Sequence, residues 1–400
     1  MRIGVIVDND LNDDKRVLRE IEILKGSGYE IFVLCFGFGG KSYKKIEGIT
    51  VSRIKIGKRT KDFLFFFLNT IPVYEWIWSS RIRNFIITNK IDSLHVHDLY
   101  MTEASRSGIR KSGSKIPLVL DLHENYSYAV TTYNWTKGFL RNLIAQPSKW
   151  QVKERQLLSY PKRIVVLSDD FRDQLLDKYN FLSAGDICVF PNVPDLEQMQ
   201  KIKIDRETIP FIKKAPVIFY FGVVAERRGI FNAIDAFKEV TGKGYDADLL
   251  IIGPVDRKDR KRFFDAIGIP ALKERINYIP WIDISKLPSY LDFSDICLAP
   301  FLRNPQHDSG VANKIFDYMC GKRPVIASDC LPQQKLIEKY KCGIIYRDQK
   351  EFSESLIRLL NDKDLLTEMG ENGYRAIISE FNLEKKKTDL INLYKGLLIN

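Results

Sequence analysis

The sequence lacks long apolar runs, and its cysteines are few and scattered. No stretch of 18 uncharged apolar residues occurs among the 400 residues, so no transmembrane helix is expected. The N-terminus passes directly into an apolar run at Ile3–Val7, without the layout of a signal peptide. Six cysteines occur without a Cys-x-x-Cys pair, as is typical of reduced thiols in a cytosolic protein. We therefore expect a cytoplasmic protein.

Signals for a nucleotide cofactor or a metal are also weak. The spacing Gly-x-Gly-x-x-Gly is absent, which argues against a dinucleotide-binding turn. His95 and His97 are two of only four histidines, and alternation along a strand places both on one face, where zinc could bind with nearby acids. A hydrolase of that kind usually opens its barrel with such a strand, whereas two strand–helix units precede it here. We predict no metal and no cofactor.

Composition indicates a globular, basic, two-domain protein. Hydrophobic residues make up 45% and charged residues 28% of the chain, and 400 residues exceed what one core usually supports. The net charge of +11 favours an anionic partner, such as phosphates, an anionic membrane or a nucleic acid. The polar stretch Leu196–Lys214 lacks a strong period and marks the expected boundary.

Strands and helices alternate along the chain, which predicts an α/β fold with parallel sheets. The predicted strands are continuous apolar runs, as expected for strands buried on both faces. They include Ile3–Val7, Glu30–Phe36, Arg163–Ser168, Val217–Gly222, Asp248–Gly253 and Ile276–Ile279.

One segment combines features of an anion site. A strand at Ile296–Phe301 leads through a polar loop to a helix from about Ala312 to Cys320, which ends at Gly321, where a left-handed residue is expected. The free N–H groups of a helix N-terminus attract anions at the carboxyl end of a parallel strand. Lys314 adds a cation in the first turn, and Asp317 adds a carboxylate one turn later. The alternative is an ordinary strand–helix corner that packs on Ile315, Phe316 and Met319.

The residues Asn313–Met319 and Gly321–Ser328 resemble the donor-site signature of family 4 retaining glycosyltransferases. The resemblance implies the GT-B fold, in which two Rossmann-like parallel-sheet domains face each other across a deep cleft. It gives Asp317 the role of the glutamate that holds the donor ribose. Ser309 stands where the family has its other glutamate, which contacts the donor sugar.

Other loops extend this resemblance over nearly the whole chain. Arg228 stands where the family has a lysine on the donor diphosphate, and Val223 stands where it has an arginine. With Lys314 and the N–H groups around Gly310 and Val311, Arg228 would stabilise the leaving group. Ile282 would lie near the nucleotide base.

The first half supplies the expected acceptor side. His97 and Asp98 end one strand, His123 and Glu124 end another, and by resemblance His123 reaches the transferred sugar. Asp13 lies in the first loop, which faces the cleft in the family. The predicted domains are 1–200 on the acceptor side and 201–378 on the donor side, with 379–400 forming a helix that crosses back. A satisfied structural histidine is the alternative for His123.

The segment 63–90 is rich in aromatic residues, and Arg81, Arg83 and Lys90 follow its aromatic part closely. This composition suits an anionic membrane surface, here the inner face of the plasma membrane, or a helix packed between sheet and solvent.

The resemblance implies an enzyme that moves a sugar, with retention, from a nucleotide-diphosphate sugar to a glycan or polyprenyl-linked acceptor in bacterial cell-surface polysaccharide synthesis. Two alternatives stay open: a sugar-nucleotide epimerase of the same fold, and a non-catalytic module that binds nucleotide sugars or nucleic acid. No basic helix or RNA-binding aromatic motif supports a nucleic acid partner.

Overall fold

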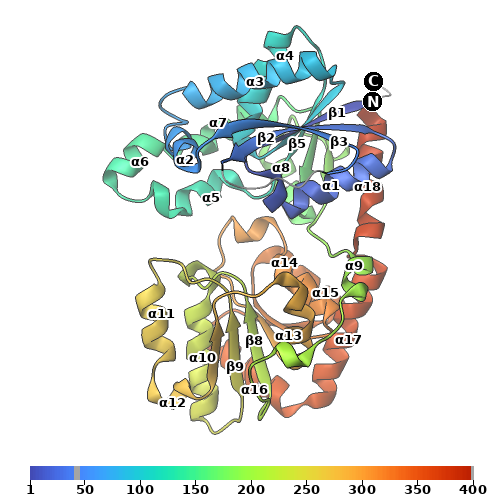
Figure 1. The fold of residues 1–400 in the computed structure, drawn as a ribbon. Helices are drawn as coiled ribbons and strands as arrows, with labels where there is room; N and C mark the ends of the chain where they lie inside the picture. Colours follow the sequence, from blue (N-terminus) through green and yellow to red (C-terminus); the bar gives the residue numbers. More distant parts are fainter. Residues whose placement is uncertain (40–45, 398–400) are drawn as a thin grey trace. The chain divides into compact units, whose positions relative to one another are not determined.

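The structure, a computed structural model, describes residues 1–39 and 46–397 (Figure 1). It divides into two compact units. Unit 1 comprises residues 1–191 and 387–400, and unit 2 comprises residues 192–386. The predicted boundaries at 200/201 and 378/379 lie within unit 2 on this division.

Unit 1 contains a seven-stranded parallel sheet in the order β3-β2-β1-β4-β5-β6-β7. The strands are β1 Arg2–Val7, β2 Glu30–Phe38, β3 Ile49–Ile56, β4 Ser93–His97, β5 Leu118–Asp121, β6 Arg163–Val166 and β7 Ile187–Val189. The helices are α1 Lys15–Gly26, α2 Lys58–Phe66, α3 Val73–Asn89, α4 Thr102–Ser112, α5 Tyr126–Thr132, α6 Phe139–Ala145, α7 Lys149–Leu158 and α8 Asp169–Lys178.

Unit 2 contains a six-stranded parallel sheet in the order β10-β9-β8-β11-β12-β13. Its strands are β8 Val217–Phe221, β9 Asp248–Ile252, β10 Ile276–Ile279, β11 Ile296–Ala299, β12 Val325–Ser328 and β13 Gly343–Tyr346. Its helices are α9 Leu196–Lys201, α10 Ile230–Gly242, α11 Arg260–Ile267, α12 Pro270–Lys273, α13 Leu287–Phe293, α14 Asn313–Cys320, α15 Leu331–Tyr340, α16 Gln349–Asn361 and α17 Lys363–Ser379. Helix α18, Leu383–Leu397, begins in unit 2, and its residues from Lys387 onward belong to unit 1.

Both sheets have the strand order of a Rossmann-like domain, which confirms the predicted pair of α/β parallel-sheet domains. The strands are continuous apolar runs because both of their faces are buried. Within β8, Phe219 packs into one hydrophobic cluster of unit 2, while its neighbours Ile218 and Tyr220 pack into the other. Successive side chains point to opposite faces of a strand, so helices must cover both faces.

The C-terminus of α14 differs from the prediction. Gly321 has φ −75°, and the left-handed residue is Lys322, with φ 55°. Gly321 instead allows close packing, because an added Cβ would lie 2.9 Å from Leu291 Cβ. The need for a glycine at this point is therefore steric and does not come from the backbone angle.

The aromatic segment 63–90 forms the end of α2, a turn, and the whole of α3. Tyr74 and Trp78 are buried in the core of unit 1, whereas Phe63 and Trp76 are 62% and 61% exposed. The core interpretation therefore holds for part of the segment, and the exposed aromatic side chains remain available to a surface.

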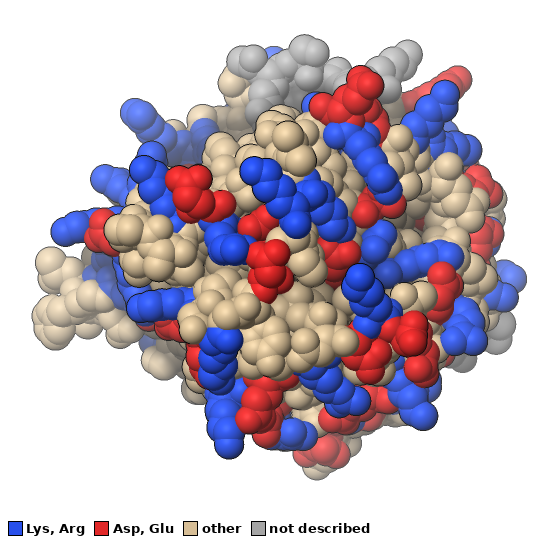
Figure 2. Space-filling model, turned by 90° about the horizontal axis from the view of Figure 1, so that it is seen from below, with Lys and Arg blue, Asp and Glu red and all other residues tan. Residues whose placement is uncertain are grey.

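On the face of the molecule that Figure 2 displays, Lys and Arg are interspersed with Asp and Glu, so neither sign of charge dominates there. Among the described residues, no helix is long and apolar enough to cross a bilayer, as expected from the sequence.

Candidate functional site

The strand order itself indicates where ligands bind in each unit. In both sheets the order reverses between the first and fourth strands, β1 and β4 in unit 1, β8 and β11 in unit 2. Ligands of open parallel sheets bind outside the carboxyl ends of the strands at this switch point. Among the predicted site residues, His97 is the last residue of β4, Arg228 follows β8, and Lys314 lies on α14, which follows β11.

Lys314 is the central cation of unit 2. Its Nζ is buried 3.8 Å from the centre of the Tyr220 ring and 5.1 Å from that of Phe301, and it has no hydrogen-bond partner among the described residues. Gly222 at the end of β8 leaves room for it, since an added Cβ would lie 3.3 Å from Nζ. Burial, reinforced by the nearby Arg228 charge, holds the pKa of Lys314 well below its usual value. A buried ammonium in this state would gain from an anionic ligand.

Arg228 and Lys314 both contact the ring of Phe301. It ends the short helix η6, Glu226–Arg228, and its guanidinium lies 5.0 Å from the Phe301 ring centre. The next residue, Gly229, has φ 72°, and an added Cβ would lie 1.5 Å from the carbonyl oxygen of Pro300, just beyond β11. This close approach fixes η6 against the sheet end, so two cations converge at one place.

The helix of the predicted donor signature is present where the sequence placed it. Helix α14 begins after Ala312, which makes no side-chain cap hydrogen bond. The N–H of Ile315 donates to the carbonyl oxygen of Ala312 at 2.9 Å, and the N–H groups of the two residues before it could meet a ligand. Asp317 lies half-buried one turn after Lys314. Gly310 and Val311 form the extended approach to the helix, with Gly310 at φ −172°.

Ser309 differs from a typical sugar-contacting residue. It is buried, and its hydroxyl donates a hydrogen bond to the carbonyl oxygen of Gln306 at 2.7 Å. Ile282 is half-buried and packs against the core of unit 2, next to Trp281, which is 72% exposed. The donor roles of both residues remain predictions.

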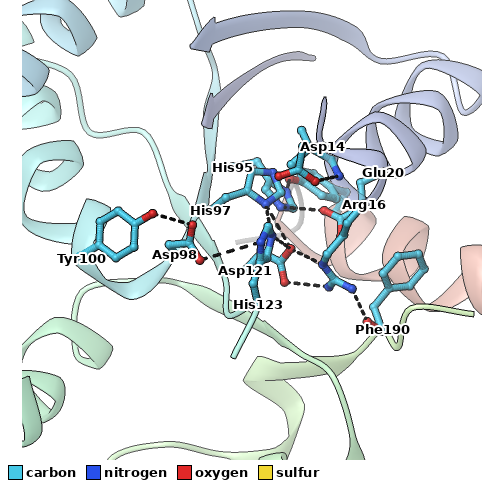
Figure 3. A network of polar contacts seen from close by, with 12 residues as sticks. Asp14, Arg16, Glu20, His95, His97, Asp98, Tyr100, Asp121, His123 and Phe190 are labelled. Atoms are coloured by element: carbon cyan, nitrogen blue, oxygen red, sulfur yellow. Dashed lines mark hydrogen bonds and ion pairs between the residues drawn. The ribbon is translucent and has the colours of Figure 1, made fainter. Parts of the chain in front are cut away.

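In unit 1 a buried ion-pair network lies at the switch point (Figure 3). Arg16, on α1, donates two hydrogen bonds of 2.8 Å to the carboxylate of Asp121, at the end of β5. It also donates to the carbonyl oxygen of Phe190 at 2.9 Å. Burial alone would raise the pKa of Asp121, but Arg16 and then His123 outweigh it and hold that pKa well below its usual value. Asp121 is thus a fixed negative charge.

The two predicted histidines, His97 and His123, meet on this carboxylate. His123 Nε2 lies 3.0 Å from Asp121 Oδ2 and 2.9 Å from His97 Nδ1, and its Nδ1 is 3.9 Å from Asp98 Oδ1. Burial opposes protonation of His123, but Asp98 and Asp121 outweigh it and raise its pKa to about 9. Burial lowers the pKa of His97 well below the usual range. At neutral pH, His123 is the charged donor of the pair and His97 is neutral.

Four side chains of this network have the donor atoms of a metal site. Glu20, His95, His97 and Asp121 offer ligand atoms within 4.8 Å of one another. However, the Arg16 guanidinium lies 2.8 Å from Asp121 and 3.1 Å from Glu20, and would repel a cation held there. His95 Nδ1 is also only 2.5 Å from the hydroxyl of Tyr394, on α18. We do not assign a metal to this cluster, and the predicted absence of one remains untested.

The remaining acceptor-side predictions lie nearby. Glu124 is half-buried and accepts a hydrogen bond from the Tyr133 hydroxyl. Asp13 ends the short helix η1, Leu11–Asp13, and its side chain lies outside the described part of the structure. Its neighbour Asp14 caps α1 by accepting from the backbone N–H of Val17 at 3.1 Å.

Several residues that shape these sites were not predicted from the sequence. Tyr220 and Phe301 supply the rings beneath the two cations, Arg16 binds Asp121, and the Tyr394 hydroxyl contacts His95. Arg16 and Glu20 alone had a detectable signal, because this pair at i, i+4 interrupts the buried face of α1. The rings resemble ordinary core residues in the sequence.

Two family models match the chain, and they meet near residue 200. The family model described as Glycosyltransferase Family 4 matches residues 15–198, and that of Glycosyl transferases group 1 matches residues 201–376. An alpha-D-kanosaminyltransferase from Streptomyces kanamyceticus is 26% identical over 184 residues, 46% of each chain. A capsular polysaccharide biosynthesis glycosyltransferase, CapM, from Staphylococcus aureus is 23% identical over 203 residues, 50% of this chain and 51% of its own. The chain thus matches about half the length of these curated relatives.

The fold extends further than the sequence similarity. A sucrose-phosphate synthase structure from Thermosynechococcus elongatus superposes with a TM-score of 0.77 at 15% identity, over 100% of this chain and 99% of its own. At this identity the match shows a shared fold alone.

Proposed function

The chain belongs to the glycosyltransferases of group 1 and family 4, and from this premise we propose that it moves a sugar from a nucleotide-diphosphate sugar to a glycan or lipid-linked acceptor, with retention of anomeric configuration. It is a transferase built on two Rossmann-like domains. The donor, the acceptor and the stereochemistry are our proposals.

The observation that carries the proposal is the pair of cations in unit 2. Burial and the Arg228 charge depress the pKa of Lys314, so an anion beside both side chains would restore the charged ammonium. A nucleoside diphosphate leaves as a stable anion, and stabilising its charge removes the need for a general acid or a metal. Each charge-assisted hydrogen bond to such an anion contributes about 1.5–3 kcal/mol.

Asp317 is the proposed ribose ligand. Its carboxylate lies on α14, one turn from the ammonium of Lys314, so one helix would hold both the diphosphate and the neighbouring diol. A carboxylate can accept one hydroxyl of the diol on each of its two oxygens, whereas an amide would present an NH₂ donor in place of one of these acceptors.

We assign the acceptor side to unit 1. His123 is the charged, partly exposed member of the buried network there, with 22% of its side chain accessible. A protonated imidazole can donate to a sugar hydroxyl while Asp121 holds it in place. The sequence offers no convincing nucleophile for a covalent intermediate, so we propose that the acceptor attacks on the face of the leaving group.

We further propose that the enzyme works at an anionic membrane surface in bacterial cell-surface polysaccharide synthesis, with docking through residues 63–90. The exposed rings of Phe63 and Trp76 and the exposed cations Arg81 and Arg83 support docking. Helix α6 extends this apolar surface, with Phe139 85% exposed, and Asn69 joins the turn after α2 to α6 through a 2.8 Å hydrogen bond to the carbonyl oxygen of Ala145. The polysaccharide role is supported by the capsular relative.

The test is incubation with a panel of sugar nucleotides while nucleoside diphosphate release is followed, with and without lipid-linked acceptors. We expect release with one donor, accelerated by an acceptor, and weaker nucleotide affinity in Asp317→Asn by calorimetry. Conversion of the donor to its epimer without acceptor would show an epimerase. Binding without turnover across a broad panel of donors and acceptors would show a non-catalytic module.

A further inference from the structure

A pocket of about 300 Å³ lies beside His123 in unit 1. Five of the side chains that line it are aromatic: Phe65, Tyr100, Tyr126, Tyr133 and Trp135. The rings brace one another, with centroid distances of 4.9 Å between Tyr100 and Tyr126 and 5.7 Å between Phe65 and Trp135. The pocket therefore has stiff, apolar walls from three separate elements: α2, the end of β4 and the α5 region.

Asp98 points a carboxylate at this pocket from an unfavourable backbone conformation. It follows β4 with φ 72° and ψ 136°, a region that residues other than glycine rarely adopt. Its backbone N–H donates to the carbonyl oxygen of Asp121 at 2.9 Å, and the Tyr100 hydroxyl donates to its Oδ2 at 2.9 Å. These contacts hold the strained residue in place and leave 22% of its side chain accessible.

Tyr126 forms the floor. Its side chain is only 4% exposed, and its hydroxyl has no hydrogen-bond partner among the described residues. A buried hydroxyl without a partner is uncommon, because leaving it unpaired costs stability. A ligand oxygen that reaches the floor would complete it.

We propose that this pocket binds the ring of a neutral sugar, the terminal residue of the acceptor glycan. The faces of a pyranose present C–H groups that pack on aromatic rings, and its hydroxyls match a small number of fixed polar groups. Asp98 accepts two of these hydroxyls and Tyr126 pairs with a third. The assignment of this pocket to the acceptor rests on the proposed transferase function. It places the terminal sugar of the acceptor, which would receive the transferred sugar, against His123.

The charges of the pocket favour a neutral ligand over a phosphate. Asp98 and Glu124 bring two carboxylates, which would repel an anion. The two lining cations are already engaged, Lys61 with Asp8 at 3.2 Å and His123 with Asp121 at 3.0 Å. A phosphate of a lipid carrier would therefore lie elsewhere, beyond the sugar.

The experiment is saturation-transfer NMR on the full chain without donor, using a panel of methyl pyranosides and, as the anionic comparator, glycerol 3-phosphate. We expect at least one pyranoside to bind and glycerol 3-phosphate not to compete with it. Asp98→Asn and Tyr126→Phe should each weaken that binding by about tenfold, the effect of losing one hydrogen bond to the ligand. Asn tolerates positive φ and Phe keeps the ring, so both variants should fold.

Tyr160→Phe is the matched control, since its hydroxyl contacts Gln156 outside the pocket and its loss should leave pyranoside binding unchanged. Binding of glycerol 3-phosphate in place of the sugars would overturn the proposal. So would equal pyranoside binding in wild type, Asp98→Asn and Tyr126→Phe, or no pyranoside binding to the wild type. Nucleoside diphosphate release, measured separately, reports on the transferase function and is not needed for this result.

Discussion

At the scale of single residues, Arg228 and Arg227 are neighbours in one short helix but have different surroundings. Arg228 shares the Phe301 ring with Lys314, whereas the backbone of Arg227 accepts a hydrogen bond from Leu302. We expect Arg228→Ala to slow transfer by two to three powers of ten, since losing charge stabilisation of the leaving group costs about 3–4 kcal/mol in the transition state. Steady-state kinetics with Arg227→Ala as the control measures this difference. Equal losses in both variants would mean that Arg228 has no special role.

His123 should make stability depend on pH. Its pKa is raised to about 9 in the folded protein, from about 6.5 in an unfolded chain. The stabilisation is thus complete below pH 6.5 and is lost as the pH rises through 9, by roughly 3 kcal/mol. Lys314, whose pKa is lowered, contributes with the opposite sign, so the comparison must be made between variants.

Urea unfolding at pH 6 and pH 9.5 tests this effect. The fall in the free energy of unfolding between the two pH values should be smaller in His123→Gln than in the wild type. An identical fall in both proteins would show that His123 is not held protonated by Asp98 and Asp121.

Residue chemistry also sets the limit of what the sequence could predict at the site. Lys314 and Asp317 were identifiable because one helix fixes their spacing at a strand end. The contact of Arg16 with Asp121 joins residues 105 positions apart, and no local pattern encodes such a pairing. The buried state of Ser309 likewise depends on how its loop folds back on Gln306.

At the scale of elements, the junction of η6 and α10 depends on Gly229. The residue combines φ 72° with an approach to Pro300 that leaves no space for a Cβ. Gly229→Ala should therefore destabilise unit 2 by more than about 1 kcal/mol and displace Arg228, with loss of activity. Gly242→Ala, near the end of the same helix, meets nothing within 4 Å and should be neutral or slightly stabilising. Similar thermal shifts in both variants would contradict the steric argument.

The elements themselves were largely predictable, and their ends were less so. Continuous apolar runs located β10 at its observed bounds and β8 at its observed start, because buried strands have a distinct pattern. The strand expected to reach Phe301 stops at Ala299, and the one expected to reach Ser168 stops at Val166. Beyond Ala299 the chain stays apolar although strand pairing has ended, so the apolar run is longer than the strand. Beyond Val166, Ser168 leaves the strand to cap α8, where its hydroxyl accepts a hydrogen bond from the backbone N–H of Phe171.

At the scale of the whole molecule, membrane docking should be electrostatic and reversible. Arg81 and Arg83 are exposed on α3, and a basic residue near an anionic surface contributes about 1 kcal/mol. Replacing both with Glu should weaken sedimentation with anionic vesicles by at least about tenfold and spare donor hydrolysis in solution. Wild-type binding should also fall steeply as salt is added.

Lys261→Glu combined with Lys273→Glu makes the same charge change at exposed positions of unit 2 and is the control. Equal binding of the wild type to neutral and anionic vesicles would contradict an electrostatic attachment. Absence of vesicle binding at low salt would favour a soluble acceptor.

Helix α18 has a consequence for how the chain is made. Tyr394 is fully buried in unit 1 and meets His95, 299 residues earlier in the sequence. When the first 191 residues have left the ribosome, Tyr394, which completes their buried network, has not yet been synthesised. The core of unit 1 therefore stays incompletely packed around His95 until the whole of unit 2 has been synthesised. Slowing translation after residue 191 should thus prolong a protease-sensitive nascent form, and releasing α18 from the ribosome should end it.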